Sequence, residues 1–254
     1  MGLAKTTRLN RIFSNPDGRI LSVAVDHFAG LTMPEGLRDV PKTISRLMTA
    51  KPDAFTMVKG MAKSAWEPHA GSVPLILQAH IMRSDDHVER TTTAEEALLL
   101  GADAVAVSFG VRGPNESMQL RMLAETVTEA ARFDMPVVTH IYPRDYSGPK
   151  TRVMTDHENI LWAVRCGVEF GADIIKVPFT GDPDGFGEIV ESSPVPVVCA
   201  GGPKTETFDE ALQMMQKVVD SGARGAVVGR NIWGMEDPLG TLRAFQEIVH
   251  PDGQ

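Results

Sequence analysis

One lysine lies in an unusually apolar stretch of the chain. Lys176 stands within Asp-Ile-Ile-Lys-Val-Pro-Phe, residues 173–179, which has the composition of a strand buried on both faces. Burial favours the neutral form of an amine, which can attack a ketone carbon, and the iminium that results accepts the electrons of a breaking carbon–carbon bond. Lys176 is therefore a candidate Schiff-base nucleophile that needs no metal. A buried ion pair, with Asp26 for example, would also explain it.

Imine chemistry needs groups that move protons to and from the carbinolamine and the substrate hydroxyl. Tyr142 and Asp26 are our candidates, because each comes at the carboxyl end of an apolar run. Asp26 could instead begin a helix or a turn, and Tyr142 could merely close the mouth of the fold. Both tyrosines of the chain, Tyr142 and Tyr146, fall in this region.

Two glycine-containing turns predict a phosphate site. Gly201 and Gly202 end one apolar run, and Gly229 and Arg230 end the next. Their backbone N–H groups, the Arg230 guanidinium and a short helix starting at Asn231 can hold one phosphate. Glycines are common in turns, so the two motifs together carry this prediction.

Four further polar residues have two interpretations each. Lys59 is the alternative Schiff-base lysine, although a contact with a substrate anion is the role we expect. His140 lines the pocket or is a core histidine. Arg144 orients substrate or forms a salt bridge. Glu116 assists proton transfer or, as we favour, caps a helix.

A metal-dependent aldolase would need histidine and carboxylate ligands. The candidates are His27, His80, Asp85, Asp86 and His87. The last three lie in a polar stretch typical of a loop or helix start, and His27 has no obvious partner. We therefore predict no metal site and no cofactor.

The elements that position these groups alternate between short apolar runs and longer amphipathic stretches, which indicates repeated βα units. Eight runs in about 210 residues favour a closed (β/α)8 TIM barrel over an open doubly wound sheet. We expect one domain, residues 1–254. The predicted strands are Leu21–Asp26, Ala54–Lys59, Val73–Ala79, Ala104–Phe109, Pro136–Tyr142, Asp173–Phe179, Val195–Gly201 and Gly225–Arg230.

Amphipathic stretches between the runs predict the helices, with three glycines as C-caps. The clearest helices are 117–133, 157–170, 208–221 and 238–249, and the glycines are Gly101, Gly171 and Gly222.

Strand side chains alternate between the barrel interior and the surrounding helices. This parity points four polar residues, from three predicted strands, into the barrel near its carboxyl end. They are Asp26, His140 with Tyr142, and Lys176.

The composition excludes several classes of protein. A net charge of −8 argues against binding to nucleic acid, although an anionic small molecule remains possible. The chain shows no signal peptide and no apolar run long enough to span a membrane. The two cysteines, Cys166 and Cys199, suit buried thiols in a reducing compartment. We expect a cytoplasmic protein.

Five motifs in order resemble a known family. They are Val-Asp-His at 25–27, Ile-Tyr-Pro-Arg at 141–144, Ile-Ile-Lys-Val at 174–177, Ala-Gly-Gly-Pro-Lys at 200–204 and Gly-Arg-Asn-Ile-Trp at 229–233. The chain is similar, from Leu21 to Trp233, to the archaeal-type class I fructose-bisphosphate aldolases. That family includes an aldolase-like synthase of archaeal aromatic biosynthesis and an enzyme that processes phosphorylated autoinducer-2.

The resemblance implies that Lys176 forms the Schiff base, Tyr142 acts as acid and base, and Asp26 is a second acid/base or orienting carboxylate. It also implies a phosphate site at the two glycine turns and a large homo-oligomer, such as a decamer. Two positions depart from the family pattern. Phe28 stands where the family usually has glycine, and His140 stands where tryptophan is frequent, so a smaller or differently substituted ketose phosphate is the alternative to fructose 1,6-bisphosphate as the substrate.

The predicted function is reversible aldol cleavage of a phosphorylated ketose. One alternative is transfer chemistry on a phosphorylated diketone with coenzyme A as the acceptor. Another is a barrel that binds a sugar phosphate without catalysis, with Phe28 filling the pocket.

Overall fold

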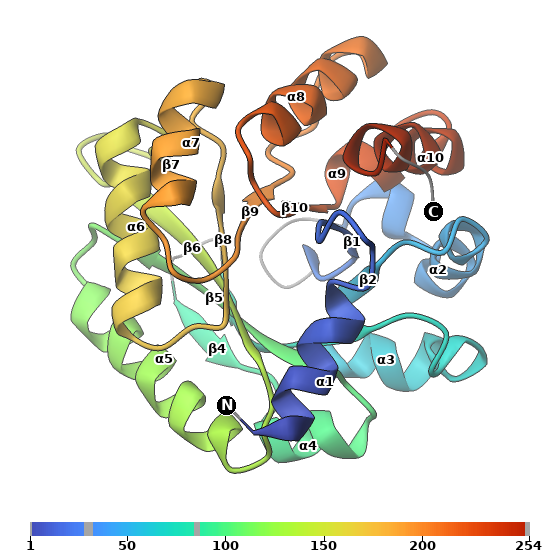
Figure 1. Cartoon of the computed structure of the whole chain (residues 1–254), viewed down its shortest axis with the longest axis horizontal. Helices are drawn as coiled ribbons and strands as arrows, with labels where there is room; N and C mark the ends of the chain where they lie inside the picture. Colours follow the sequence, from blue (N-terminus) through green and yellow to red (C-terminus); the bar gives the residue numbers. More distant parts are fainter. Residues whose placement is uncertain (1, 28–32, 84–86, 252–254) are drawn as a thin grey trace.

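The computed structural model of the chain describes residues 2–27, 33–83 and 87–251. Within them, eight parallel strands form a closed barrel surrounded by helices (Figure 1). The pairings of β1 with β10 and of β2 with β3 complete the ring. The predicted (β/α)8 barrel is confirmed. Its strands are β1 Ile20–Ala24, β2 Ala54–Met57, β3 Leu75–Met82, β5 Ala104–Val111, β6 Val137–Asp145, β8 Ile174–Pro178, β9 Val197–Ala200 and β10 Gly225–Val228.

The helices follow the strands in the expected order. The three predicted cap glycines all have positive φ, at 75° for Gly101, 85° for Gly171 and 75° for Gly222, and end α4, α6 and α8. No helix in the described part of the chain is long and apolar enough to cross a membrane. The helices are α2 Val40–Met48, α3 Lys59–Ala65, α4 Ala94–Leu99, α5 Glu116–Ala131, α6 His157–Glu169, α7 Pro183–Glu191, α8 Phe208–Asp220, α9 Arg230–Trp233 and α10 Pro238–Val249, with short 3₁₀ helices η2 Glu35–Leu37 and η3 Glu67–His69.

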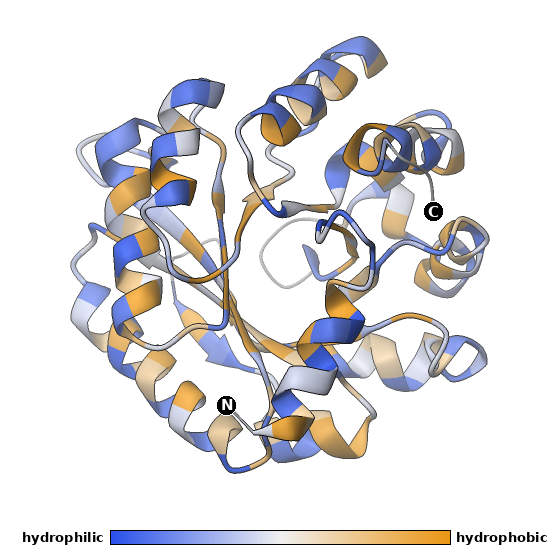
Figure 2. Cartoon of the chain, in the orientation of Figure 1, coloured by the Kyte–Doolittle hydropathy of each residue, from blue (hydrophilic) through white to orange (hydrophobic). Residues whose placement is uncertain are grey.

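The strand parity predicted from the sequence is confirmed by two separate apolar clusters. Leu21, Val23 and Ile175 pack outward against the helices. Ala24 and Ile174 pack inside the barrel. In Figure 2 the strands are largely apolar and the helices mix polar and apolar residues, as expected when only the strands are buried on both faces.

An additional helix covers the amino-terminal end of the barrel. This helix, α1 Leu3–Ile12, crosses the near face in Figure 1. Ile12 is fully buried and joins the apolar cluster inside the barrel, against which Leu9 and Phe13 also pack. The sequence did not predict α1, because its surface is mostly polar and only one turn is buried.

Three aspartates tie this lower end together. Asp53, Asp103 and Asp173 each come just before a barrel strand, and each accepts a hydrogen bond from a backbone N–H of an adjoining strand. Each carboxylate also meets a basic side chain from outside the barrel. These partners are His250 for Asp53, Arg11 for Asp103 and Lys5 for Asp173.

His250 links the end of α10 to this network and predicts a pH-dependent stability. Its ring nitrogens lie 2.8 Å from Asp17 Oδ2 and 2.9 Å from Asp53 Oδ2. Burial alone would lower the pKa of His250, but the hydrogen bonds and charges of Asp53 and Asp17 outweigh burial and raise it. The stabilisation is therefore complete below the unfolded pKa of about 6.5 and is lost as the pH rises through the folded pKa.

We expect His250→Gln to lower the free energy of unfolding by about 2 kcal/mol at pH 6 and by less at pH 9. Urea unfolding at both pH values measures this difference. His157→Gln is the control, because the His157 side chain is 44% exposed in its ion pair with Glu188. An equal loss at both pH values in His250→Gln would show that the charge of His250 does not contribute.

Two short hairpins lengthen the barrel at its carboxyl end. The strand β4 Val88–Arg90 pairs antiparallel with β3, and β7 Arg152–Val153 pairs antiparallel with β6. They raise the wall on one side of the mouth, where Met82 and Val153 border the cavity described next.

Candidate active site

A cavity of about 340 Å³ opens at the carboxyl end of the barrel. Its walls come from several strands and the loops that follow them. This is the end at which active sites of barrel enzymes lie. The lining residues are Asp26, His27, Gln78, Ile81, Met82, Arg83, Ser108, His140, Tyr142, Arg144, Val153, Lys176 and Arg230.

Lys176 lies at the floor of this cavity and is 5% exposed. Below it, the barrel is filled by small and branched apolar side chains such as Ala106 and Val138. Among the described residues, no carboxylate forms an ion pair with Lys176, and the Asp26 carboxylate contacts Gln78 and His27 instead. The structure therefore does not support a buried Lys176–Asp26 salt bridge.

Asp26 stands just beyond the end of β1, where its carboxylate has two neighbours. Gln78 donates a hydrogen bond from Nε2 to Asp26 Oδ2. His27 Nδ1 lies 3.3 Å from Asp26 Oδ1, too poorly aligned for a hydrogen bond. The pKa of His27 is lowered, above all by burial and also by the charges of Lys176 and Arg230, although Asp26 opposes this. A neutral His27 therefore packs edge-on against Trp233, at 5.2 Å between ring centroids.

His140 lies beside Lys176, because the two residues are register partners on β6 and β8. Its side chain is 2% exposed, and its Nδ1 lies 3.1 Å from Gln78 Nε2. Burial first, and then the charges of Lys176 and His27, hold the pKa of His140 well below its usual value. The imidazole is neutral, and it lines the cavity rather than the packed core.

Tyr142 and Arg144 continue along β6 on the same face as His140 and reach the wall of the cavity. Tyr142 is partly exposed, so its phenol meets both the cavity and solvent. Arg144 brings a positive charge to the outer part of the same wall. The structure thus brings together Lys176, Tyr142 and Asp26, the three predicted catalytic residues.

The two glycine turns are held together by one buried asparagine. Asn231 accepts a hydrogen bond from the Thr205 N–H at 2.8 Å and donates to the carbonyls of Gly201 and Pro203 at 2.8 and 2.9 Å. A β-carbon on Gly201 would lie 2.9 Å from Val228 Cα, so the strands can pack only with glycine there.

One part of the predicted phosphate site needs correction. The Gly201 N–H donates to the Val227 carbonyl at 3.0 Å and is not available to a ligand. Gly202 lies one residue further, with φ of 67°, and Gly229 packs against His27. Of the four residues predicted for these two turns, only Arg230 lines the cavity. Burial lowers the pKa of the Arg230 guanidinium, and its buried Nε has no hydrogen-bond partner within residues 2–27, 33–83 and 87–251.

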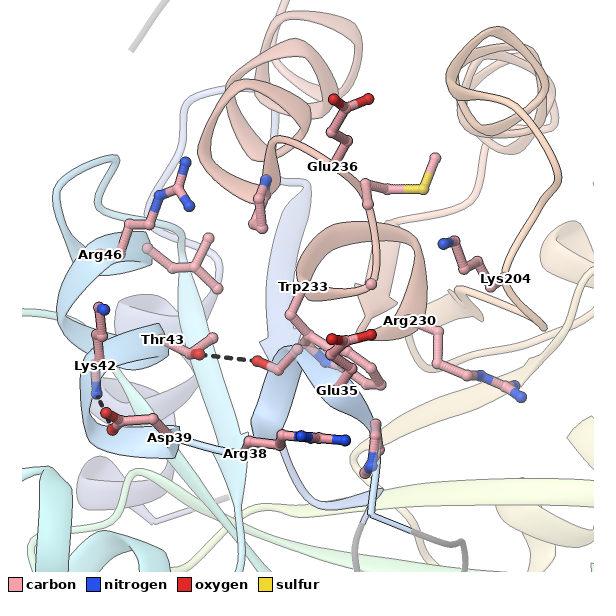
Figure 3. A pocket seen from close by; sticks show the side chains of 16 residues that line it. Glu35, Arg38, Asp39, Lys42, Thr43, Arg46, Lys204, Arg230, Trp233 and Glu236 are labelled. Carbon is pink, nitrogen blue, oxygen red and sulfur yellow. Dashed lines mark hydrogen bonds between the residues drawn. The ribbon is translucent and has the colours of Figure 1, made fainter.

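Arg230 also borders a second, larger cavity of about 710 Å³ between η2 and α2 on one side and α9 and α10 on the other. Figure 3 shows Arg38, Lys42 and Lys204 around it, together with the acidic Glu35 and Glu236. Charges of both signs therefore face this space, and the acid/base candidates lie in the smaller cavity.

Two other candidates lie away from the catalytic cavity. Lys59 begins α3, and its ammonium is 2.8 Å from a carboxylate oxygen of Glu96, so the structure does not bring it to the site. Glu116 begins α5 and accepts hydrogen bonds from the Arg112 N–H and the Trp162 indole. Glu116 thus holds the loop before α5 and does not cap the helix, whose N-cap residue Asn115 also makes no side-chain capping hydrogen bond, so the capping role that the sequence favoured is wrong.

The histidine and carboxylate candidates for a metal site are spread out. A β-bulge between Gln78 and His80 turns His80 toward the helices, where burial above all lowers its pKa to about 4. Asp85 and Asp86 lie outside the described residues, as does Phe28. Among the residues that are described, no three metal-binding side chains cluster together.

Gln78 is one site residue that the sequence interpretation missed. It is the polar position in the predicted strand Val73–Ala79, and alternation along that strand points it into the barrel. The same parity argument that selected Lys176 would have found it. Ser108, the register partner of His140 on β5, is a second omission of this kind.

Comparison with known proteins adds an independent line of information. A family model described as DeoC/LacD family aldolase matches residues 17–235. The chain is 36% identical over 203 residues to fructose-bisphosphate aldolase class 1 of Thermoproteus tenax, which covers 78% of this chain and 75% of the relative. It is 33% identical over 254 residues to 2-amino-3,7-dideoxy-D-threo-hept-6-ulosonate synthase of Halobacterium salinarum, covering 98% and 92%.

Solved structures agree with these sequence matches. An archaeal fructose 1,6-bisphosphate aldolase superposes with a TM-score of 0.85 at 32% identity, over 97% of this chain and 99% of that one. A second structure, of an archaeal fructose-1,6-bisphosphate aldolase whose catalytic lysine is covalently bound to the carbinolamine intermediate, also gives 0.85 at 32% identity, over 96% and 99%.

Proposed function

Since this chain belongs to the DeoC/LacD family of aldolases and is a class I, Schiff-base aldolase, we propose that Lys176 forms the imine and that the substrate is a phosphorylated ketose. The observation that carries this proposal is a buried lysine that forms no ion pair with any described residue and is set among proton-carrying side chains in one cavity. Transfer to coenzyme A and a purely binding role are not favoured, because the named relatives are aldolases and a synthase.

In the proposed reaction, the Lys176 amine adds to the ketone carbon and gives a carbinolamine, which loses water to form the iminium. A base removes the proton of the hydroxyl two carbons away, the carbon–carbon bond breaks, and an aldehyde leaves. The electron pair of that bond becomes the enamine. Protonation and hydrolysis of the enamine then release the ketone and restore Lys176.

Tyr142 is the proposed acid and base in these steps, because its phenol belongs to the same face of β6 as His140, next to the strand of the lysine. Asp26 orients the substrate hydroxyls or relays a proton. Its carboxylate is held by Gln78, which suits a fixed acceptor.

Arg230 is the proposed anchor of the substrate phosphate, with the Gly202 and Gly229 turns beside it and Arg144 on the opposite wall. A guanidinium whose buried Nε lacks a partner has an unmet donor that a phosphate oxygen can accept from. We expect Arg230→Gln to raise KM for a phosphorylated ketose by about 10- to 100-fold. Steady-state kinetics measure this, and an unchanged KM would place the phosphate elsewhere.

Fructose 1,6-bisphosphate is the first substrate to test, because relatives and solved neighbours bear that activity in their names. Borohydride reduction in the presence of dihydroxyacetone phosphate, followed by peptide mapping by mass spectrometry, tests the imine directly. We expect one reduced adduct, on Lys176. An adduct on Lys59 would contradict the assignment, and no adduct with any ketose phosphate would remove the Schiff base from this cavity.

We also propose that the protein assembles as a homo-oligomer. Two exposed apolar side chains meet the loop after β5, since Tyr146 packs beside Gly113 and Trp162 lies 4.5 Å from the Arg112 guanidinium. An exposed apolar patch of this kind suits an interface. Light scattering should give a mass that is a multiple of the 27.6 kDa chain mass. Trp162→Glu should lower that measured mass. Other exposed apolar side chains of the neighbouring elements α5 and α6 are Met118 and Leu161.

The cytoplasm is the proposed location. Cys166 and Cys199 are free and buried, and burial raises the pKa of the Cys166 thiol to about 12 and that of Cys199 as well. Unpaired thiols suit a reducing compartment. Cell fractionation tests this, and recovery outside the cytoplasm would contradict it.

A further inference from the structure

Gln78 joins two groups of the catalytic cavity, the Asp26 carboxylate and the His140 imidazole. Its side-chain nitrogen contacts Asp26 Oδ2 and lies 3.1 Å from His140 Nδ1. A carboxylate only accepts hydrogen bonds, so the nitrogen of the Gln78 amide, and not its oxygen, must face Asp26. The orientation of the amide therefore follows from its neighbour.

The same amide determines which ring nitrogen of His140 carries the hydrogen. The Gln78 nitrogen has two hydrogens, and once Asp26 accepts one, the other points to His140 Nδ1, which must accept it. A neutral imidazole that accepts at Nδ1 carries its hydrogen on Nε2. His140 is neutral for the reasons given above, chiefly its burial.

Two polar atoms of this group have no hydrogen-bond partner in the part of the chain that the structure describes. They are His140 Nε2 and Gln78 Oε1, in side chains that are 2% and 1% exposed. Both residues line the catalytic cavity. One atom is a donor and the other an acceptor, and native proteins rarely leave buried groups of either kind unsatisfied. A substrate hydroxyl can accept from His140 Nε2–H. It does not also reach Gln78 Oε1, because the Nε2–H bond and the Nδ1 lone pair that faces Gln78 point in widely different directions from the ring.

The position of His140 relative to Lys176 specifies which hydroxyl. His140 is the register partner of Lys176 on the adjoining strand, and adjoining strands lie about 4.8 Å apart. A group bound by His140 is then close to the carbon that Lys176 holds.

We propose that Gln78 is a positioning residue for Asp26 and His140, and that His140 Nε2–H selects substrates with a hydroxyl on the carbon next to the imine carbon. This inference rests on the proposed role of Lys176. It goes beyond that role by naming the substrate group that the histidine recognises.

The kinetic test compares dihydroxyacetone phosphate with hydroxyacetone phosphate, its analogue without that hydroxyl, in aldol addition to one aldehyde. We expect wild type to prefer the hydroxylated ketone, and Gln78→Met and His140→Phe each to reduce the ratio of the two kcat/KM values by about 10- to 100-fold. The double variant should reduce it no further, because the two residues act as one unit. A ratio that is unchanged in Gln78→Met overturns the proposal.

Gln246→Met is the matched control. Gln246 is also a buried glutamine, but it donates to the Ala50 carbonyl behind the barrel and does not line the cavity. Its substitution should leave the ratio as in wild type. A similar fall of the kcat/KM ratio in Gln246→Met would show that the loss of any buried amide causes the effect.

A spectroscopic test addresses the positioning role separately. In ¹⁵N-histidine-labelled protein, the His140 signal, assigned by its loss in His140→Phe, should show a bare Nδ1 and a protonated Nε2, and Gln78→Met should mix or exchange the two forms. Hydrogen on Nδ1 in wild type overturns the proposal.

The borohydride experiment separates this inference from the proposed function. Absence of borohydride trapping in wild type would remove the proposed function. Trapping together with an unchanged ratio of kcat/KM values in Gln78→Met would remove this inference alone.

Discussion

Lys176→Met is expected to lower the rate of aldol cleavage by about 10⁴-fold or more while leaving the protein at least as stable as wild type. The loss follows because methionine has no amine and forms no iminium, so the electrons of the breaking bond have no acceptor. The stability follows from burial. The side chain is 5% exposed, no described carboxylate pairs with it, and an apolar chain of similar size avoids the cost of desolvating a charge.

The paired measurement is kcat for ketose phosphate cleavage and the midpoint of thermal unfolding on the same preparations. Lys176→Arg is the matched control for charge, since it keeps a cation at the floor of the cavity but cannot form an imine. Both variants should be inactive, and only the methionine variant should gain stability. Cleavage within about tenfold of wild type in either variant would show that another residue forms the imine.

A rise in stability together with a loss of activity is the behaviour of a residue kept for chemistry rather than for folding. The alternative that the sequence left open, a structural ion pair, predicts the reverse, because removing one partner of a buried pair destabilises by about 3–5 kcal/mol. The unfolding measurement therefore decides between the two readings of Lys176 independently of any choice of substrate.

The barrel was predictable because two patterns are regular along the chain. Short apolar runs alternate with amphipathic stretches, and side chains alternate between the two faces of each strand. Alternation along the strand assigned Ala24 and Asp26 to the interior and Val23 and Val25 to the helices, and the two apolar clusters divide the apolar members of this set in the same way. Glycine caps after three helices were also predictable, since a left-handed residue is favoured where a helix turns back toward a strand.

Two features were not predictable from those patterns. The α1 helix buries little more than Ile12, so its pattern resembles that of a surface segment. The bulge after Gln78 breaks the alternation of β3, so that counting by two from Gln78 would place His80 inside the barrel, whereas it faces the helices. Local parity holds only as far as the ladder is regular.

The positions of site residues were also easier to predict on regular strands than in loops. Residues on strands, such as Lys176, were placed by parity, whereas residues in loops were placed by analogy with other barrels. Gly201 illustrates the second case. Its position after β9 suggested an amide directed at phosphate, but that amide completes the ladder to Val227. Lys59 similarly begins a helix and pairs with Glu96 instead of facing the cavity.

Tyr142→Phe is expected to lower kcat by about 10²- to 10³-fold with little change in KM. The phenol is the proposed proton carrier for loss of water from the carbinolamine and for the substrate hydroxyl, and phenylalanine keeps the ring and loses only the O–H. Lys176 remains able to add to the ketone, so slow borohydride trapping should persist on that residue. This combination separates a proton-transfer residue from the nucleophile, whose loss removes both cleavage and trapping.

The chain provides its own control for this experiment, because it has one other tyrosine. Tyr146 is 38% exposed and packs beside Gly113, outside the residues that line the cavity. Tyr146→Phe should therefore keep the wild-type kcat. If the two variants lost activity equally, the phenol of Tyr142 would have no special part in proton transfer. In that case the role would pass to Asp26, whose carboxylate is already oriented by Gln78 at the same cavity, and Asp26→Asn would be the variant that separates trapping from cleavage.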